Sequence, residues 1–352
     1  MRYSLLADKH LILILIVKLF SPYIFLCVAF LSIGIFSCQN KKQATATEAE
    51  PELAGPVFNE DSALAYCVEQ CAFGPRTMNS TAHDECEAWI ISKFKQYGCE
   101  VSTQKADLKG WDGTLLHSTN IIARLNPQAQ QRIIICAHWD SRPWADNDPD
   151  EANHRKPVMA ANDGASGIGV MIELARIISA NEQQPNYGID FVCFDAEDYG
   201  TPSWSGKEDE DSWALGAQYF AKNIANTALG ANWSGTAILL DMVGGQGAKF
   251  YQEGLSQHYA QSIVDGVWQA ANEAGYGSYF LNQTGGYITD DHKPLNEAGI
   301  PTIDIIPYYP DCEASAFGPT WHTVNDDIHH LDKNTLKAVG QTIIQYLYTI
   351  DN

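Results

Sequence analysis

The stretch RIIICAHWD, residues 132–140, decides the fold class of this chain. After Arg132 it holds a short run of apolar and small residues, which is typical of a strand buried on both faces of a parallel sheet. His138 and Asp140 follow directly at the carboxyl end of that run. The stretch therefore predicts a central strand whose end carries polar, chemically useful side chains.

Helix and strand patterns alternate on both sides of this strand. Upstream lie two helical and two strand patterns, at residues 59–72, 82–97, 99–108 and 118–125. Downstream, helices and short strands follow one another, at residues 164–180, 189–194, 212–224, 236–240, 257–274, 277–281, 292–298, 301–306 and 334–348. This alternation predicts a single α/β domain, with a mixed, mostly parallel central sheet covered by helices on both faces.

Acidic and imidazole side chains follow the buried strands of this pattern. They are His138, Asp163, Asp195, Glu197, Asp198, Asp241, Asp290, Asp291, His292 and His322. In an α/β sheet the ligand site lies at the carboxyl ends of the strands, so we expect these side chains to converge on one edge. Any one of them alone could be structural; Asp163, for example, could simply cap the helix that follows it.

The joint pattern indicates a divalent cation. Carboxylates gathered at one edge repel one another, and a mixed Asp/Asp/His set suits zinc. We expect Asp163, Asp198 and His322 to hold one zinc ion and to leave a fourth position for water or a substrate carbonyl. If the strand alternation continues, Glu197 points away from Asp198, which makes Glu197 the candidate general acid/base.

The first 37 residues differ from the rest of the chain. They are mostly apolar after an early Arg and Lys, which is typical of a signal segment, and they end in IFSC. This end resembles the bacterial lipoprotein cleavage box, with Cys38 as the residue that is acylated. We therefore expect a lipoprotein signal segment at 1–37, a flexible tether at 38–57 and a zinc-dependent catalytic domain at 58–352. The alternative is an uncleaved transmembrane anchor.

These features predict the location of the protein and exclude one class of partner. We expect a lipid-anchored protein in the cell envelope of a Gram-negative-type bacterium, facing the periplasm and touching the membrane only through its anchor. Residues 1–37 carry a net charge of +2, so removing them takes the formal charge from −21 to −23. Such an acidic balance argues against nucleic acid as a partner, because its phosphates would be repelled. Oligomeric state leaves no mark in the sequence, and a monomer is the expectation.

Six of the seven cysteines in the expected domain fall into two groups. Cys136 and Cys193 lie within apolar strand patterns, where we expect buried thiols without a disulfide. Four others lie near the two N-terminal helices, where one disulfide could form: Cys67, Cys71, Cys86 and Cys99.

Five short motifs give the chain a family resemblance. In order, they are CAHWDS, ANDGASG, FDAED, LLDMVG and WHTVND, and the resemblance that they carry covers roughly residues 60–350. Their order and spacing resemble those of the zinc aminopeptidase-like exopeptidases. Within that superfamily the chain looks most like the glutaminyl-peptide cyclotransferases of the animal type. Trp321 before His322, the ITDDH run at 288–292 and Trp204 after Asp198 carry this closer resemblance.

The resemblance implies an activity and a set of roles. These enzymes cyclise the N-terminal glutamine of peptides and proteins to pyroglutamate and release ammonia, by zinc-assisted intramolecular aminolysis. It implies one zinc held by Asp163, Asp198 and His322, and a proton shuttled by Glu197. The resemblance also places Asp241 and Asp290 beside Glu197 in an acidic hydrogen-bond network. It also implies a substrate pocket shaped by Trp204, Ile288, Phe317 and Trp321.

The chain departs from the animal pattern at three places. Asp198 stands where those enzymes have Glu, and Thr289 stands where they have Gln. The animal disulfide that begins at the position of Cys136 has no evident partner, since the expected region reads SGIG at 166–169. These departures affect zinc affinity and pocket detail more than the class of reaction.

Two other functions compete with the cyclase interpretation. A two-zinc aminopeptidase would use His138 as a second-metal ligand, and all five residues of that metal set are present: His138, Asp163, Asp198, Asp241 and His322. A binding lipoprotein on a decayed enzyme scaffold would lack a ligand or the general base, and none is missing. Trp204, Trp321 and the DDH run favour the cyclase, because a hydrolase does not need them.

Overall fold

The structure is a computed structural model, and residues 53–350 are described in it. The expected signal segment, Cys38 and most of the expected tether lie outside the described residues. Within residues 53–350, no helix combines the length and the apolar character needed to cross a membrane.

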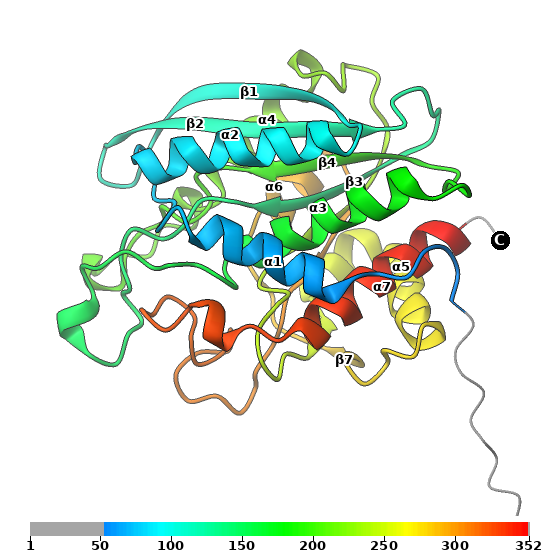
Figure 1. The fold of residues 1–352 in the computed structure, drawn as a ribbon. Helices are drawn as coiled ribbons and strands as arrows, with labels where there is room; N and C mark the ends of the chain where they lie inside the picture. Colours follow the sequence, from blue (N-terminus) through cyan, green and yellow to red (C-terminus); the bar gives the residue numbers. More distant parts are fainter. Residues whose placement is uncertain (1–52, 351–352) are drawn as a thin grey trace, which may run out of the picture. The chain divides into compact units, whose positions relative to one another are not determined.

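A six-stranded mixed sheet forms the centre of the fold (Figure 1). Its strands lie in the order β1-β2-β4-β3-β5-β8. They span β1 Glu100–Lys109, β2 Leu115–Leu125, β3 Arg132–His138, β4 Gly188–Phe194, β5 Gly235–Leu240 and β8 Thr302–Ile305. The pairs β1–β2 and β2–β4 are antiparallel, whereas β4, β3, β5 and β8 run parallel. The mixed, mostly parallel sheet expected from the sequence is therefore confirmed.

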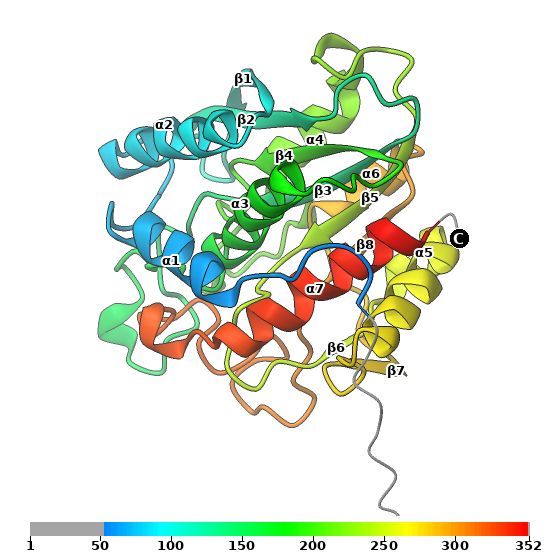
Figure 2. The same cartoon turned by 45° about the vertical axis from the view of Figure 1, so that its right-hand side comes forward.

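Helices cover both faces of the sheet (Figures 1 and 2). They span α1 Glu60–Cys71, α2 Thr81–Gln96, α3 Ala165–Ala180, α4 Leu215–Asn223, α5 Gly254–Glu273, α6 His292–Glu297 and α7 Lys333–Thr349. Alternation along β3 separates two cores: Ile133 and Ile135 pack with α1, α2, α3, α5 and α7, whereas Ile134 and Cys136 pack with α4 and α6. This two-sided burial explains why residues 133–137 of the strand are apolar or small.

Three local expectations need correction. The helix expected at 212–224 begins only at Leu215, because Ala214 has a left-handed backbone (φ 53°) and donates its N–H to the carbonyl of Glu197. The strand expected at 277–281 is β7 Phe280–Thr284, which pairs outside the main sheet with β6 Phe250–Gln252, a strand not expected at all. The seven described cysteines are all unpaired, so the possible disulfide near α1 and α2 does not form.

Residues 54–58, here named the N-terminal strap, lie along α7. The backbone N–H groups of Ala54 and Phe58 donate to the side-chain oxygens of Gln345 and Gln341, each at 2.8 Å. The Phe58 ring is fully buried and occupies the space over Gly340. Phe58 is therefore part of the domain core, and residues 54–57, which the sequence predicts to be tether, lead directly into it.

Candidate active site

The carboxyl ends of the parallel strands bring the expected residues together. His138 ends β3, and Asp241 directly follows β5. Asp163 lies just before α3, whose N-cap is Gly164 and receives no side-chain hydrogen bond, so Asp163 does not cap the helix. Gly167 allows α3 to approach this closely, because a Cβ there would collide with the carbonyl of Leu240.

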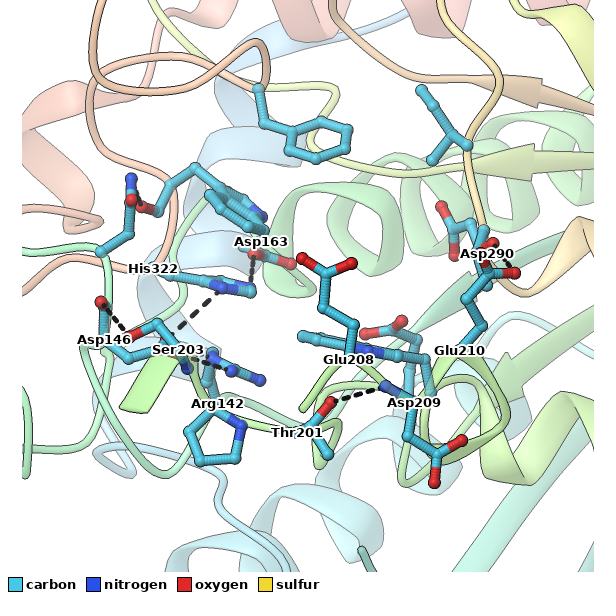
Figure 3. Close-up of a pocket in the computed structure, with 18 of the residues that line it drawn as sticks. Arg142, Asp146, Asp163, Thr201, Ser203, Glu208, Asp209, Glu210, Asp290 and His322 are labelled. Atoms are coloured by element: carbon cyan, nitrogen blue, oxygen red, sulfur yellow. Dashed lines mark hydrogen bonds and ion pairs between the residues drawn. The ribbon is translucent and has the colours of Figure 1, made fainter. Parts of the chain in front are cut away.

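Asp163, Asp198 and His322 form the first donor set. One ligand atom from each lies within 4.8 Å of the others, and all three residues are buried. The Nε2 atom of His322 lies 3.2 Å from Oδ1 of Asp198 and 3.5 Å from Oδ2 of Asp163. Figure 3 shows His322 pointing toward Asp163. These are the three residues expected to bind zinc.

His138, Asp163 and Asp241 form a second donor set that shares Asp163 with the first. The Nε2 atom of His138 lies 2.9 Å from Oδ1 of Asp163 and 3.3 Å from Oδ1 of Asp241. His138 is therefore held between two carboxyl groups in this structure. The same three residues are those that a two-metal enzyme would use.

The chemistry of the first donor set fits zinc. Two carboxylates and one imidazole are common zinc ligands, and three protein ligands leave an open position, as in catalytic zinc sites. The buried Oδ2 atom of Asp198 has no hydrogen-bond partner among the described residues, as expected for an atom that faces a cation. His322 has a left-handed backbone (φ 53°), an unfavourable conformation that its surroundings must enforce.

Glu197 lines the cavity beside this set, whereas Asp198 is buried behind it. The two side chains differ in position for a reason other than the expected strand alternation. β4 already ends at Phe194, and Ala196 in the loop that follows has a left-handed backbone (φ 55°). The two oxygens of Asp140 accept the backbone N–H groups of Glu197 and Asp198, each at 3.1 Å. One buried carboxylate thus fixes the direction of both side chains.

A second buried carboxylate, Asp326, supports the Asp163 side of the site. Its Oδ1 and Oδ2 atoms accept the backbone N–H groups of Asn162 and Asp163 at 2.8 and 3.0 Å. Burial raises the pKa of Asp326 to about 7, against the lowering effect of those two N–H groups. Asp326 ends the WHTVND motif, but no local pattern shows that it reaches the loop before α3.

Burial is the main cause of the raised pKa values of Glu197 and Asp241 in the site. It raises the pKa of Glu197 well above its usual range, and the nearby His138 opposes this. Burial, followed by the charge of Asp290, raises the pKa of Asp241 to about 8. A carboxyl group with a raised pKa can both accept and donate a proton near neutral pH, which suits a proton shuttle.

A cavity of about 810 Å³ opens over these residues (Figure 3). Ile288, Phe317 and Trp321 line it, together with the three expected catalytic carboxyl groups, Glu197, Asp241 and Asp290. The Trp321 ring stacks on the ring of His322 with the two centroids 3.7 Å apart. The volume lies within the range of small-molecule sites.

Trp204 lies elsewhere and is not among the residues that line the cavity. Its ring contacts Trp144, with centroids 5.9 Å apart, and the guanidinium of Arg155, 3.8 Å from the ring centroid. Trp213, which sequence reasoning missed, does line the cavity, and its ring lies parallel to that of His322 at 5.9 Å. The expected role of Trp204 stays a prediction, and Trp213 is a second candidate for it.

Arg142 is a buried cation that the sequence did not single out. Its guanidinium bonds Asp146 through two nitrogens, at 2.6 and 2.8 Å, and lies 3.4 Å from Oδ1 of Asp198. It also lies 4.6 Å from the ring centroid of Trp213. Arg142 therefore partly balances the carboxylates of the site and holds Asp198 and Trp213 together.

The parallel sheet with acidic and imidazole donors at its strand ends defines a zinc exopeptidase-like α/β protein. The chain belongs to peptidase family M28, whose model matches residues 120–347. The family is zinc-dependent, and the candidate metal site is present in the described structure.

Solved structures and relatives of two kinds resemble the chain. The glutaminyl cyclase of Bacteroides thetaiotaomicron, solved with N-acetylhistamine bound, is 47% identical with a TM-score of 0.80; the match covers 84% of this chain and 99% of that one. The glutaminyl-peptide cyclotransferase of Bos taurus is 24% identical over 65% of this chain and 66% of its own length. The aminopeptidase YwaD of Bacillus subtilis is 29% identical over 74% of this chain. This chain spans about half of YwaD, at 50%.

Proposed function

We propose that this protein cyclises the N-terminal glutamine of peptides to pyroglutamate and releases ammonia. The observation that carries the proposal is the cavity, which Glu197 lines beside the Asp163–Asp198–His322 donor set, together with the apolar side chains of Ile288, Phe317 and Trp321. The likeness to bacterial glutaminyl cyclases at 47% identity supports it. The proposed substrates are peptides or proteins that begin with Gln.

Glu197 is the proton carrier in this reaction. The α-amine of the substrate attacks its own side-chain amide carbon, so a carbon–nitrogen bond forms and closes a five-membered ring. Glu197 takes a proton from the attacking amine and returns it to the departing nitrogen, which leaves as ammonia when the old carbon–nitrogen bond breaks. A zinc ion at the first donor set would supply Lewis-acid polarisation of the side-chain carbonyl.

The cavity walls contribute by folding the substrate. Ile288, Phe317 and Trp321 bound the space next to the donor set, so a glutamine side chain is held in the bent form that brings its amine to its amide carbon. Glu208, Asp209 and Glu210 also line the cavity and attract a positively charged amino terminus. The charge of Asp290 adds to the raised pKa of Glu197, and Asp241 lines the same cavity.

One observation favours a second candidate, a two-zinc aminopeptidase. The His138–Asp163–Asp241 set has the residue types and spacing of a second metal site. We favour the cyclase with one zinc because of the 47% identity to a bacterial glutaminyl cyclase and because the Trp321 ring stacks on His322. The number of zinc ions in the purified protein, measured by mass spectrometry, distinguishes the two.

The decisive experiment compares two dipeptide amides, one beginning with Gln and one with Leu. We expect ammonia from the Gln substrate, no free leucine from the other, and loss of activity with a zinc chelator. Glu197→Gln should lower turnover by at least about 10²-fold, because general acid/base catalysis contributes about 10²–10⁴-fold. The variant should keep its zinc. Free leucine, or full activity in the variant, would overturn the proposal.

We propose further that the protein is a monomer held at the membrane by a lipid on Cys38, facing the periplasm. The apolar segment 1–37 and the IFSC sequence support this placement. Cys38→Ser should move the protein from the membrane fraction to the soluble fraction of a Gram-negative host. Continued membrane association of that variant would favour the uncleaved transmembrane anchor.

A further inference from the structure

The carboxylate of Glu253 contacts both the start of α5 and residues 288–292. Glu253 is only 1% exposed and directly precedes α5. Its Oε1 atom accepts the backbone N–H of Leu255 at 2.8 Å, and its Oε2 atom accepts the N–H and the hydroxyl of Ser256 at 2.6 and 2.7 Å. Glu253 is therefore the N-cap of α5.

The same carboxylate also holds both ends of residues 288–292, here named the pocket segment. Its Oε1 atom accepts the backbone N–H of Ile288 at 3.1 Å, and its Oε2 atom lies 3.1 Å from Nε2 of His292. Between these two anchor points lies Asp290, which lines the cavity. The position of a reaction residue is thus tied to a carboxylate that does not line the cavity.

His292 extends these contacts to the main sheet. Its Nδ1 atom lies 3.7 Å from Oδ2 of Asp304 in β8, and one atom each of Asp290, His292 and Asp304 lies within 4.8 Å of the others. The hydroxyl of Ser256 accepts the N–H of Asp304 at 2.9 Å. The pocket segment, α5 and β8 therefore meet at one buried cluster.

An ionised carboxylate is required at this position. Burial alone would raise the pKa of Glu253, but the hydrogen bond from His292 and the N–H groups of Leu255 and Ser256 lower it to about 2. The hydrogen-bond partners of its two oxygens among the described residues are N–H and O–H groups, with Nε2 of His292 as the donor of its ring. A glutamine amide would place its own NH₂ against some of these donors and lose those bonds.

We propose that Glu253 is a positioning residue for the reaction: through Ile288 and His292 it fixes the pocket segment, and with it Asp290 and one wall of the cavity. This inference rests on the proposed function for the roles of Ile288 and Asp290. Because catalysis depends steeply on placement, a shifted pocket segment lowers turnover even when the fold persists.

The test compares Glu253→Gln with a matched helix-cap variant, Asp332→Asn. Asp332 caps α7 in the same way, since its carboxylate accepts the N–H of Asn334 at 2.9 Å, but the bond is exposed to solvent. Glu253→Gln should lower the melting temperature, whereas Asp332→Asn should change it less, because Asn caps a helix about as well as Asp. We expect Glu253→Gln to lower kcat about 10- to 100-fold at a temperature where it is folded. KM should change less, zinc content should stay unchanged, and Asp332→Asn should keep kcat within about twofold.

A second variant keeps the proposal testable if Glu253→Gln does not fold. His292→Asn breaks the contact from the other side and leaves the α5 cap intact. We expect His292→Asn to lower kcat as well. The double variant should have a kcat no lower than that of the less active single variant, because the two residues act through one contact. Independent, multiplying losses would overturn the proposal, as would a Glu253→Gln variant with normal kcat.

The measurements also separate this proposal from the function it rests on. All variants are compared with the unmodified protein on whichever amide, Gln or Leu, that protein turns over. Absence of ammonia from the Gln substrate contradicts the cyclase, while the ratio of rates on the Leu substrate still decides the role of Glu253. A second zinc ion that is lost in His292→Asn would overturn the positioning role, because the cluster would then be a metal site.

Discussion

At the scale of single residues, two carboxylates outside the first donor set determine how the site is built. Asp140 holds the backbone of Glu197 and Asp198, and Asp326 holds that of Asn162 and Asp163. Each satisfies two buried N–H groups that would otherwise lack a partner in a loop. The directions of the ligands and of the general base are therefore set by backbone hydrogen bonds.

Trp213 and Trp204 allow a prediction at this scale. Trp213→Ala should raise KM by about tenfold, because its ring lines the cavity and lies parallel to His322. Trp204→Ala should leave KM nearly unchanged, since its ring contacts Trp144 and Arg155 instead. Steady-state kinetics on the Gln dipeptide amide measure both effects. The reverse ranking would restore Trp204 as the pocket residue.

At the scale of elements, the strands and helices of the main fold could be predicted from apolar patterns alone. The strand at 132–137 and its neighbours are recognisable because burial on both faces favours continuous apolar runs, here 133–137 and 191–194. The start of α4 could not be predicted, since the left-handed Ala214 depends on a hydrogen bond to the carbonyl of Glu197. β6 has only three residues, too few for a periodic pattern.

Some residues of the candidate site could likewise be predicted from the sequence, and others could not. The pattern predicts that Asp163, Asp198 and His322 meet, because strand ends share an edge of the sheet. It could not predict Trp213 or Arg142, whose contacts with His322 and Asp198 depend on the course of loops. Glu253 was equally hidden, since a carboxylate before a helix usually indicates only a cap.

Because α3 lies so close to the sheet, we predict that a larger side chain at Gly167 affects stability and zinc binding. Gly167→Ala should destabilise the protein by about 1–3 kcal/mol, because the added methyl would collide with the carbonyl of Leu240. It should also weaken zinc binding, since Asp163 directly precedes the helix that must move. Urea denaturation and zinc titration measure the two effects. Ser179→Ala, at the exposed end of α3, is the control and should change neither.

At the scale of the whole molecule, one continuous core joins the N-terminal strap to the sheet. Phe58 belongs to the same buried cluster as the inward residues of β3 and α7, such as Ile133 and Ile343. Phe58→Ala should therefore cost about 3–5 kcal/mol of folding free energy. It should leave kcat unchanged at temperatures where the protein is folded, as denaturation and kinetics can establish. A matching loss of kcat would show that the strap influences the site.

The strap also decides where tension enters the domain. A pull on the chain ahead of residue 53 acts first on the hydrogen bonds of Ala54 and Phe58 to α7, and on the buried Phe58 ring. α7 supplies none of the residues that line the cavity. Load on the amino-terminal side of the chain therefore enters the domain at α7, on residues that do not line the cavity.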